Sequence, residues 1–244
     1  DCSADDSRQA FYSAVETVCR AAISLSERFA AEAERQARRH PAHRQRLLAV
    51  AECCRRAPAH APHTLQQALY FAWLMHELIE FEGEAVRSLG HFDQMFLPYY
   101  RADLDAGRLT PEQAKELFKY YWIKSTARTR GTHNGAHFCL GGQWTNGSDA
   151  TNELTHLLLD AYRELNAPDP KLSVRFHAHT PDRLYRQVLE MIRDGHNAMV
   201  LMNDEVAIPA LVKRGKTLAD ARSYLPIGCY EPAVDGKEAA CTTN

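Results

Sequence analysis

Apolar residues in the first 125 positions recur at the spacing of a helix. Between residues 8 and 39 they return every three or four positions, which predicts one long amphipathic helix. The dipeptide His40-Pro41 interrupts this pattern, and the same spacing resumes in a second helix that reaches residue 57. The first half of the chain is therefore expected to be almost entirely helical.

Two more helices in this half carry start signals. The pattern Thr64-x-x-Gln67 is a capping box, and the segment after it is apolar on most sides, which predicts a buried helix. Thr110 and Gln113 repeat the pattern, with Pro111 at the first helical position, where proline is favoured. These signals predict helix starts near residues 65 and 111.

Beyond residue 130, short apolar runs alternate with segments of helical spacing. The predicted strands are 137–142, 171–179 and 198–202, and 224–229 is expected to be extended. The predicted helices are 149–165, 182–195 and 217–223. Strands that alternate with helices at short intervals are typical of an α/β fold, in which helices cover a sheet. No linker or repeat separates the halves, so we expect one domain over residues 1–244.

Composition narrows the possible functions. The chain has 45% hydrophobic residues, and a net charge of −2 offers no basic surface for nucleic acid or an anionic membrane. The sequence has no run of about 18 apolar residues, so no transmembrane helix is predicted. Seven cysteines without a C-x-x-C pair indicate buried thiols in a reducing cytoplasm.

The spacing of the histidines bears on whether the chain binds a metal ion. The twelve histidines show no metal-binding spacing, so no metal site is predicted. His177 and His179 are expected to share one face of a strand. Asp204 is interpreted as a helix cap or a polar contact at a strand end.

The closing stretch Gly228–Pro232 combines a thiol and a carboxylate. In an extended segment Cys229 and Glu231 point to the same side, about 6–7 Å apart, and Pro232 is expected to end the strand. An acid beside a thiol raises the thiol pKa, which disfavours a thiolate nucleophile. Two interpretations remain: hydrogen-atom chemistry at sulfur with the carboxylate moving a proton, or an inert buried cysteine.

Several stretches resemble one superfamily. GCYEP resembles the Gly-Cys-x-Glu-Pro loop of the glycyl radical enzymes, which include pyruvate formate-lyase, glycerol dehydratase and choline trimethylamine-lyase. The other stretches that resemble it, in the same order, are RRAPAHAPHTLQQALYFAWLMH, SLGHFDQMFLPYYRADLDAGRLTPEQAKELF, LGGQWTNGSDATNELTHLLLDAY, PKLSVRFH and LMNDEVAIPALVKRGKTLADARSYLPIGCYEP. Together they span residues 45–244. The resemblance implies part of a ten-stranded α/β barrel wrapped by helices, with a mostly helical N-terminal portion.

The same resemblance implies catalytic roles. Cys229 matches the cysteine that becomes a thiyl radical, and Glu231 matches the acid/base partner of the eliminating members. The expected activity is therefore that of a radical lyase, a dehydratase or related C–O or C–N eliminating enzyme acting on a small polar substrate. The alternatives are a radical decarboxylase of aryl acetates, a formate acetyltransferase-like enzyme, and an inert α/β binding module. Tyr230 stands where pyruvate formate-lyase has a second cysteine, which disfavours acetyl transfer.

The sequence departs from the superfamily near its substrate pocket. Ala85-Val86 stands where many diol dehydratases carry a His-Ser pair. We therefore expect the substrate to meet the neighbouring Glu84 or Arg87. Two more candidates for the pocket wall are His133 and His137.

The resemblance also implies partners. The radical glycine of the superfamily follows the cysteine loop, and no Arg-Val-x-Gly-Tyr stretch occurs in these 244 residues. The chain is therefore expected to be an interior fragment, inactive alone, with no bound cofactor. A radical S-adenosylmethionine activase is expected to install the glycyl radical. The full-length protein is expected to be a homodimer in an anaerobic cytoplasm.

Overall fold

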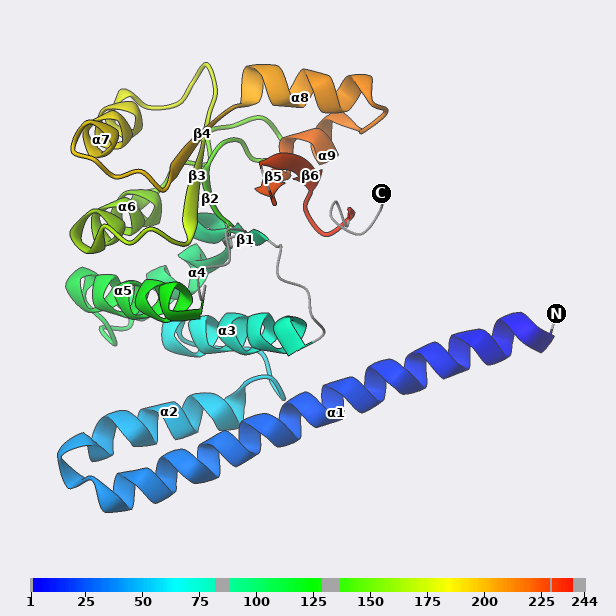
Figure 1. Ribbon diagram of the computed structural model, residues 1–244, viewed down its shortest axis with the longest axis vertical. Helices are drawn as coiled ribbons and strands as arrows, with labels where there is room; N and C mark the ends of the chain where they lie inside the picture. Colours follow the sequence, from blue (N-terminus) through cyan, green and yellow to red (C-terminus); the bar gives the residue numbers. More distant parts are fainter. Residues whose placement is uncertain (1, 82–87, 129–136, 229, 239–244) are drawn as a thin grey trace. The chain divides into compact units, whose positions relative to one another are not determined.

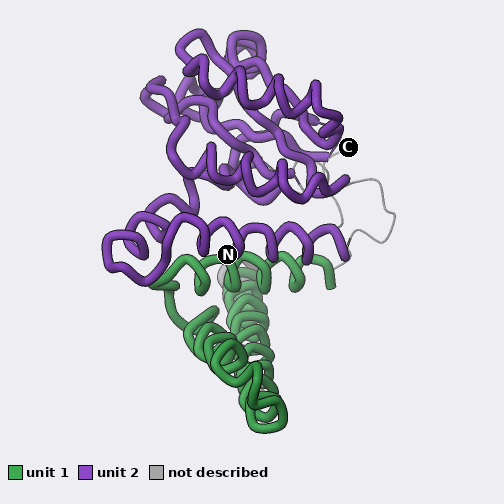
Figure 2. The backbone as a smooth tube through the Cα atoms, turned by 90° about the vertical axis from the view of Figure 1, so that its left-hand side faces the viewer, with its two compact units in different colours: residues 1–82 green, residues 83–244 purple. Residues whose placement is uncertain are grey.

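The computed structural model describes residues 2–81, 88–128, 137–228 and 230–238, and it divides into two compact units, Asp1–Glu82 and Gly83–Asn244 (Figure 2). The first unit is helical. Its elements are α1 (Cys2–Arg39), the short 3-10 helix η1 (Pro41–His43), α2 (Arg44–Arg56) and α3 (Leu65–Phe81). None of the described helices is long and apolar enough to cross a membrane.

Helices α1 and α2 lie side by side, joined at the predicted break (Figure 1). The buried cluster between them is made of small residues, namely Ala30, Ala33, Ala51 and Cys54. The buried Ser26 hydroxyl lies 2.7 Å from the carbonyl oxygens of both Cys54 and Ala57. The Ser26 hydroxyl can donate its single proton to either of these carbonyl groups at the end of α2. Ser26 therefore joins the two helices.

The second unit is an α/β structure. Its parallel sheet has the order β1 (Ser88–His91), β2 (His137–Gly141), β3 (Lys171–Phe176) and β4 (Met199–Asn203). The helices are α4 (Phe92–Asp105), α5 (Pro111–Arg128), α6 (Glu153–Leu165), α7 (Asp182–Arg193), α8 (Asp204–Lys213) and α9 (Leu218–Arg222). Strands β5 (Tyr224–Ile227) and β6 (Glu231–Val234) form a separate antiparallel hairpin (Figure 1).

Aromatic side chains fill the core between the sheet and the helices. The Phe138 ring of β2 lies 4.3 Å from the ring of Phe92 in α4 and 5.4 Å from that of Trp122 in α5, measured between centroids. All three side chains are completely buried. Burial of each stabilises the fold by about 1.5–3 kcal/mol, so one face of the sheet is fixed against α4 and α5.

A buried carboxylate joins three elements of this unit. Asp93, in the first turn of α4, accepts hydrogen bonds from the Gly141 backbone N–H at 2.8 Å and from the Thr155 hydroxyl at 2.5 Å. Its other oxygen is buried and has no hydrogen-bond partner among the residues that the structure describes. Burial raises the pKa of Asp93 to about 6. The carboxyl group therefore links α4, β2 and α6.

The helix-start signals are confirmed, and each predicted strand is present, although β3 ends at Phe176 and does not reach residue 179. Gln113 N–H donates to the Thr110 hydroxyl, and Thr110 N–H donates to the Gln113 side chain. Helices α4 and α8 were not predicted, and each contains an internal proline, Pro98 or Pro209. Proline usually ends a helical pattern, so packing has overridden a local signal in both helices.

Candidate active site

The sheet has one apolar face and one polar face. Side chains alternate along a strand, so His137 of β2 and Ser173 and Arg175 of β3 point to the same side. All three are at most 1% exposed. The opposite face carries the apolar residues Phe138, Leu140, Leu172 and Val174. Strands of a parallel sheet are usually apolar on both faces, so three buried polar side chains on one face need partners.

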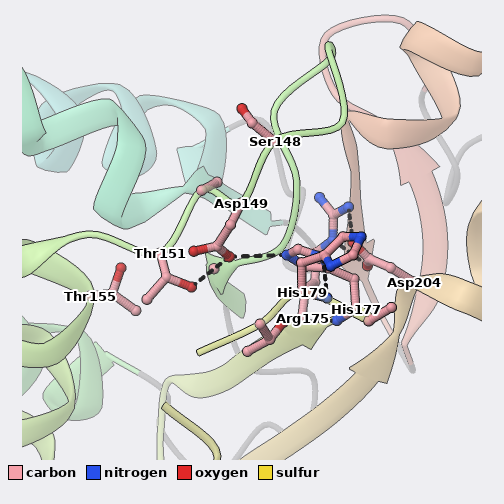
Figure 3. A network of polar contacts seen from close by, with 12 residues as sticks. Ser148, Asp149, Thr151, Thr155, Arg175, His177, His179 and Asp204 are labelled. Carbon is pink, nitrogen blue, oxygen red and sulfur yellow. Dashed lines mark hydrogen bonds and ion pairs between the residues drawn. The ribbon is translucent and has the colours of Figure 1, made fainter. Parts of the chain in front are cut away.

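Arg175 finds its main partner in the residue that follows β4. Its guanidinium donates to both Asp204 carboxylate oxygens, at 2.9 and 2.8 Å, and both side chains are completely buried (Figure 3). The Tyr224 hydroxyl also donates to this carboxylate at 2.9 Å, and the Tyr224 ring lies 4.0 Å from the guanidinium carbon. A bidentate ion pair stacked on an aromatic ring is a rigid arrangement.

The same guanidinium holds the root of the β5–β6 hairpin. Arg175 donates to the carbonyl oxygens of Arg222 and Tyr224, both at 2.9 Å. Gly142 makes room for this side chain, because a Cβ atom there would lie 2.7 Å from the guanidinium carbon. His91, at the end of β1, places its Nε2 atom 3.1 Å from the Ser223 carbonyl oxygen, which only a donor can approach.

His137 holds the other end of β5. Its Nε2 atom lies 2.7 Å from the Gly228 carbonyl oxygen, and its Nδ1 atom lies 3.1 Å from the Ser173 hydroxyl. Arg175 stands near the carboxyl end of β3, whereas His137 is the first residue of β2. The strand β5 therefore runs along the polar face from the carboxyl end of β3 to the amino end of β2, attached through carbonyl groups at and beside its two ends.

Burial keeps the His137 ring neutral. Desolvation lowers its pKa, and the positive charge of Lys171 acts in the same direction, against the Gly228 hydrogen bond and the Glu231 charge. The edge of the ring packs against Tyr230, with centroids 5.3 Å apart at 87°. A neutral imidazole has one N–H, and the carbonyl fixes that N–H on Nε2.

The extended geometry expected for Cys229 to Glu231 is wrong. Tyr230 has φ = 83°, in the left-handed region, and Gly228 has φ = 59°. The chain therefore turns between β5 and β6, and the argument that an extended strand aligns the two side chains does not hold. Pro232 does not end the strand either, since it lies inside β6 opposite Pro226. Glu231 is the first residue of β6, and its side chain is exposed.

Four of the six predicted site residues lie outside the residues that the structure describes. These are Cys229, Glu84, Arg87 and His133. Of the two described candidates, Glu231 follows Tyr230 in the hairpin, whereas His137 belongs to β2 and contacts the hairpin tip through Gly228 and Tyr230. The proposed catalytic and substrate-binding roles remain predictions.

Two other polar predictions are corrected. His177 and His179 do not share a strand face, because β3 ends at Phe176 and a turn follows, in which Thr180 N–H donates to the His177 carbonyl. His177 Nε2 instead pairs with Asp149 Oδ1 at 3.0 Å (Figure 3). The described residues contain no group of three side chains that could hold a metal ion.

Of the two roles expected for Asp204, the helix cap is wrong and the polar contact at a strand end is confirmed. Asn203, whose side chain accepts from Glu205 N–H, caps α8, whereas Asp204 is the counter-ion of Arg175. Neither Arg175 nor Ser173 was among the predicted site residues. The alternation in KLSVRF carried a signal, but it is the same for a polar face in water and for one covered by a hairpin.

A four-stranded parallel sheet covered by helices, with a hairpin attached across its polar face, is the arrangement expected for part of an α/β barrel with an internal loop. The family model described as "Pyruvate formate lyase-like" matches residues 1–244. Isethionate sulfite-lyase of Nitratidesulfovibrio vulgaris is 33% identical over 95% of this chain and 30% of its own length. (2S)-3-sulfopropanediol dehydratase of Klebsiella oxytoca is 33% identical over 93% of this chain and 29% of its own length.

The solved structures agree with the sequence relatives. A glycyl radical enzyme from Archaeoglobus fulgidus superposes with a TM-score of 0.84 at 31% identity, covering 89% of this chain and 30% of that protein. The chain belongs to the pyruvate formate lyase-like family of glycyl radical enzymes. It spans about 30% of the length of these relatives.

Proposed function

We propose that the chain supplies the cysteine hairpin of a glycyl radical lyase that removes a β-substituent from a small polar substrate. The observation that carries the proposal is the attachment of the hairpin through four carbonyl groups to the buried side chains of His137 and Arg175 and to the partly buried side chain of His91. Such attachment fixes the loop that carries Cys229 and Glu231. Radical transfer needs this, because reacting atoms must be held close together.

The chemistry balances with these two residues. The Cys229 thiyl radical takes a hydrogen atom from the carbon that bears the substrate hydroxyl. The Glu231 carboxylate accepts the hydroxyl proton, the β-substituent leaves with its bonding electron pair, and Glu231 then passes the proton to the leaving group, which restores the carboxylate. The carbon radical that remains takes a hydrogen atom back from the Cys229 thiol, which gives a carbonyl product and restores the thiyl radical.

A glycyl radical, which converts the Cys229 thiol into the thiyl radical, is proposed to come from a segment outside these 244 residues. A radical S-adenosylmethionine activase is the proposed partner that installs it, and a homodimer is the proposed assembly. The relatives named above act on a sulfonate and on a sulfonated diol. Water and sulfite are therefore the leaving groups to test first.

The test uses the complete protein, activated without oxygen. Electron paramagnetic resonance should show a glycyl doublet, and the protein should convert a substrate in a panel of vicinal diols, isethionate and amino alcohols. Cys229→Ser should retain the doublet and lose turnover, and Glu231→Gln should reduce kcat by at least about 100-fold. Full turnover by Cys229→Ser would sink the proposal. Release of CO₂ from an aryl acetate, with no elimination, would instead support the decarboxylase alternative.

A further inference from the structure

The hairpin has two attachment points of different kinds. Its root is held by Arg175 and His91, which donate to carbonyl groups of residues 222–224. Its tip is held by His137, which donates to Gly228, the residue before Cys229. The root bonds lie at the opposite end of β5 and do not by themselves fix where the tip stands.

The Gly228 carbonyl determines which nitrogen of His137 carries the proton, and the Ser173 hydroxyl supplies the matching donor. The Gly228 carbonyl can only accept, so Nε2 must carry a hydrogen atom, and in the neutral ring Nδ1 must accept. The Ser173 hydroxyl, completely buried on the adjacent strand, lies 3.1 Å from Nδ1 and supplies that donor. Both nitrogens of His137 are thus occupied by the protein, which leaves no ring nitrogen for a substrate.

We propose that His137 is a positioning residue: its Nε2–H holds the Gly228 carbonyl and sets the position of the hairpin tip, and the Ser173 hydroxyl supports this tautomer by donating to Nδ1. The inference rests on the proposed function, since it assigns His137 to the support of Cys229 and Glu231 and not to substrate binding. The tip needs such support. Tyr230 has φ = 83°, a conformation that costs a non-glycine residue about 1–2 kcal/mol, and the His137 ring packs against the Tyr230 side chain.

Three variants separate the parts of this arrangement. His137→Phe keeps a ring against Tyr230 and removes the N–H. His137→Gln offers an amide N–H of similar reach. Ser173→Ala leaves Nε2 bonded but removes the donor to Nδ1. The matched control is His196→Phe, because His196 is also buried but its ring packs on Tyr162 of α6.

The first measurement is hydrogen exchange of residues 224–234, which needs no radical activation. Loss of one hydrogen bond should make the tip amides, Tyr230 N–H among them, exchange about tenfold faster in His137→Phe. Ser173→Ala should give a smaller increase, and His137→Gln should return most of the protection. Unchanged protection in His137→Phe, or an equal change in His196→Phe, would overturn the proposal.

The second measurement is steady-state kinetics of the activated complete protein. A positioning role predicts that His137→Phe lowers kcat about tenfold and changes KM by less than about twofold, with recovery in His137→Gln. A rise in KM at constant kcat would assign His137 to substrate binding and overturn the positioning role. If the wild-type protein turns over no substrate, the proposed function fails, yet the exchange data still decide the role of His137. Should His137→Phe not fold, Ser173→Ala decides in its place, and unchanged tip exchange there overturns the fixed tautomer.

Discussion

The pair formed by Arg175 and Asp204 should be among the most costly contacts of the second unit to break. In Arg175→Met, the Asp204 carboxylate stays completely buried and loses both guanidinium hydrogen bonds. The carbonyl groups of Arg222 and Tyr224 lose a donor in the same step. Breaking a buried ion pair costs about 3–5 kcal/mol, and each orphaned buried acceptor adds about 1–3 kcal/mol. We expect Arg175→Met to lower the free energy of unfolding by at least about 4 kcal/mol.

A double-mutant cycle tests the reasoning. Asp204→Leu alone leaves a buried guanidinium charge and should cost about 3–5 kcal/mol, whereas Arg175→Met with Asp204→Leu removes both charges together. The double variant should therefore lose less than the sum of the single variants, by about 2 kcal/mol or more. Urea unfolding, followed by tryptophan fluorescence at neutral pH, gives each free energy of unfolding.

The control is an ion pair of similar bidentate geometry on the surface. Arg101 contacts Glu153 at 2.5 and 2.8 Å, and the two side chains are 55% and 47% exposed. Arg101→Met should cost less than about 1 kcal/mol, because water screens and solvates the charges. If Arg175→Met costs no more than this control, or if the cycle is additive, the pair is not the anchor that we infer.

Three further predictions concern other buried contacts. Asp93 has a folded pKa of about 6 against an ordinary 3.8, so its contribution to stability is fully present below pH 3.8 and is lost as the pH rises through 6. In the wild-type protein this loss lowers the free energy of unfolding by about 3 kcal/mol as the pH rises, and Asp93→Asn should abolish that decrease. Urea unfolding between pH 4 and 7 measures it, and the same pH dependence in wild type and Asp93→Asn would contradict the raised pKa of Asp93. Gly142→Ala should lower the free energy of unfolding by at least about 2 kcal/mol, because the new Cβ atom displaces Arg175 and residue 142 has φ = 79°. Urea unfolding measures this change, and unaltered stability would show that Arg175 can move without cost. Ser26→Ala should lower the unfolding free energy by about 1–3 kcal/mol, since the carbonyls of the α2 end lose their donor, and a neutral result in thermal melts would show that water replaces it.

Local chemistry accounts for the parts of the fold that the sequence predicted. The capping box of Thr110 and Gln113 is satisfied within four residues, so no distant contact is needed to form it. The partners of the polar side chains of β3 could not be predicted from local sequence. Ser173 and Arg175 receive their partners from segments 29 or more residues away, and an alternating pattern alone indicates a face in contact with water. The turn at Tyr230 was equally hidden, because a tyrosine gives no signal for a positive φ.

Attachment through carbonyl groups has a consequence for the candidate site. Arg175, His91 and His137 donate hydrogen bonds to backbone carbonyl groups of residues 222–228. Every residue type has the same carbonyl group. Side chains at the tip can therefore change without loss of these bonds. The exposed side chain at position 230 stands beside Glu231 and contributes only a ring contact to the anchoring. Under the proposed function, a hairpin built in this way separates the requirement for a fixed cysteine loop from the requirement for a pocket that fits a particular substrate. His91, His137 and Arg175 on β1, β2 and β3 would meet the first requirement, and the second would be left to side chains at the tip that can vary.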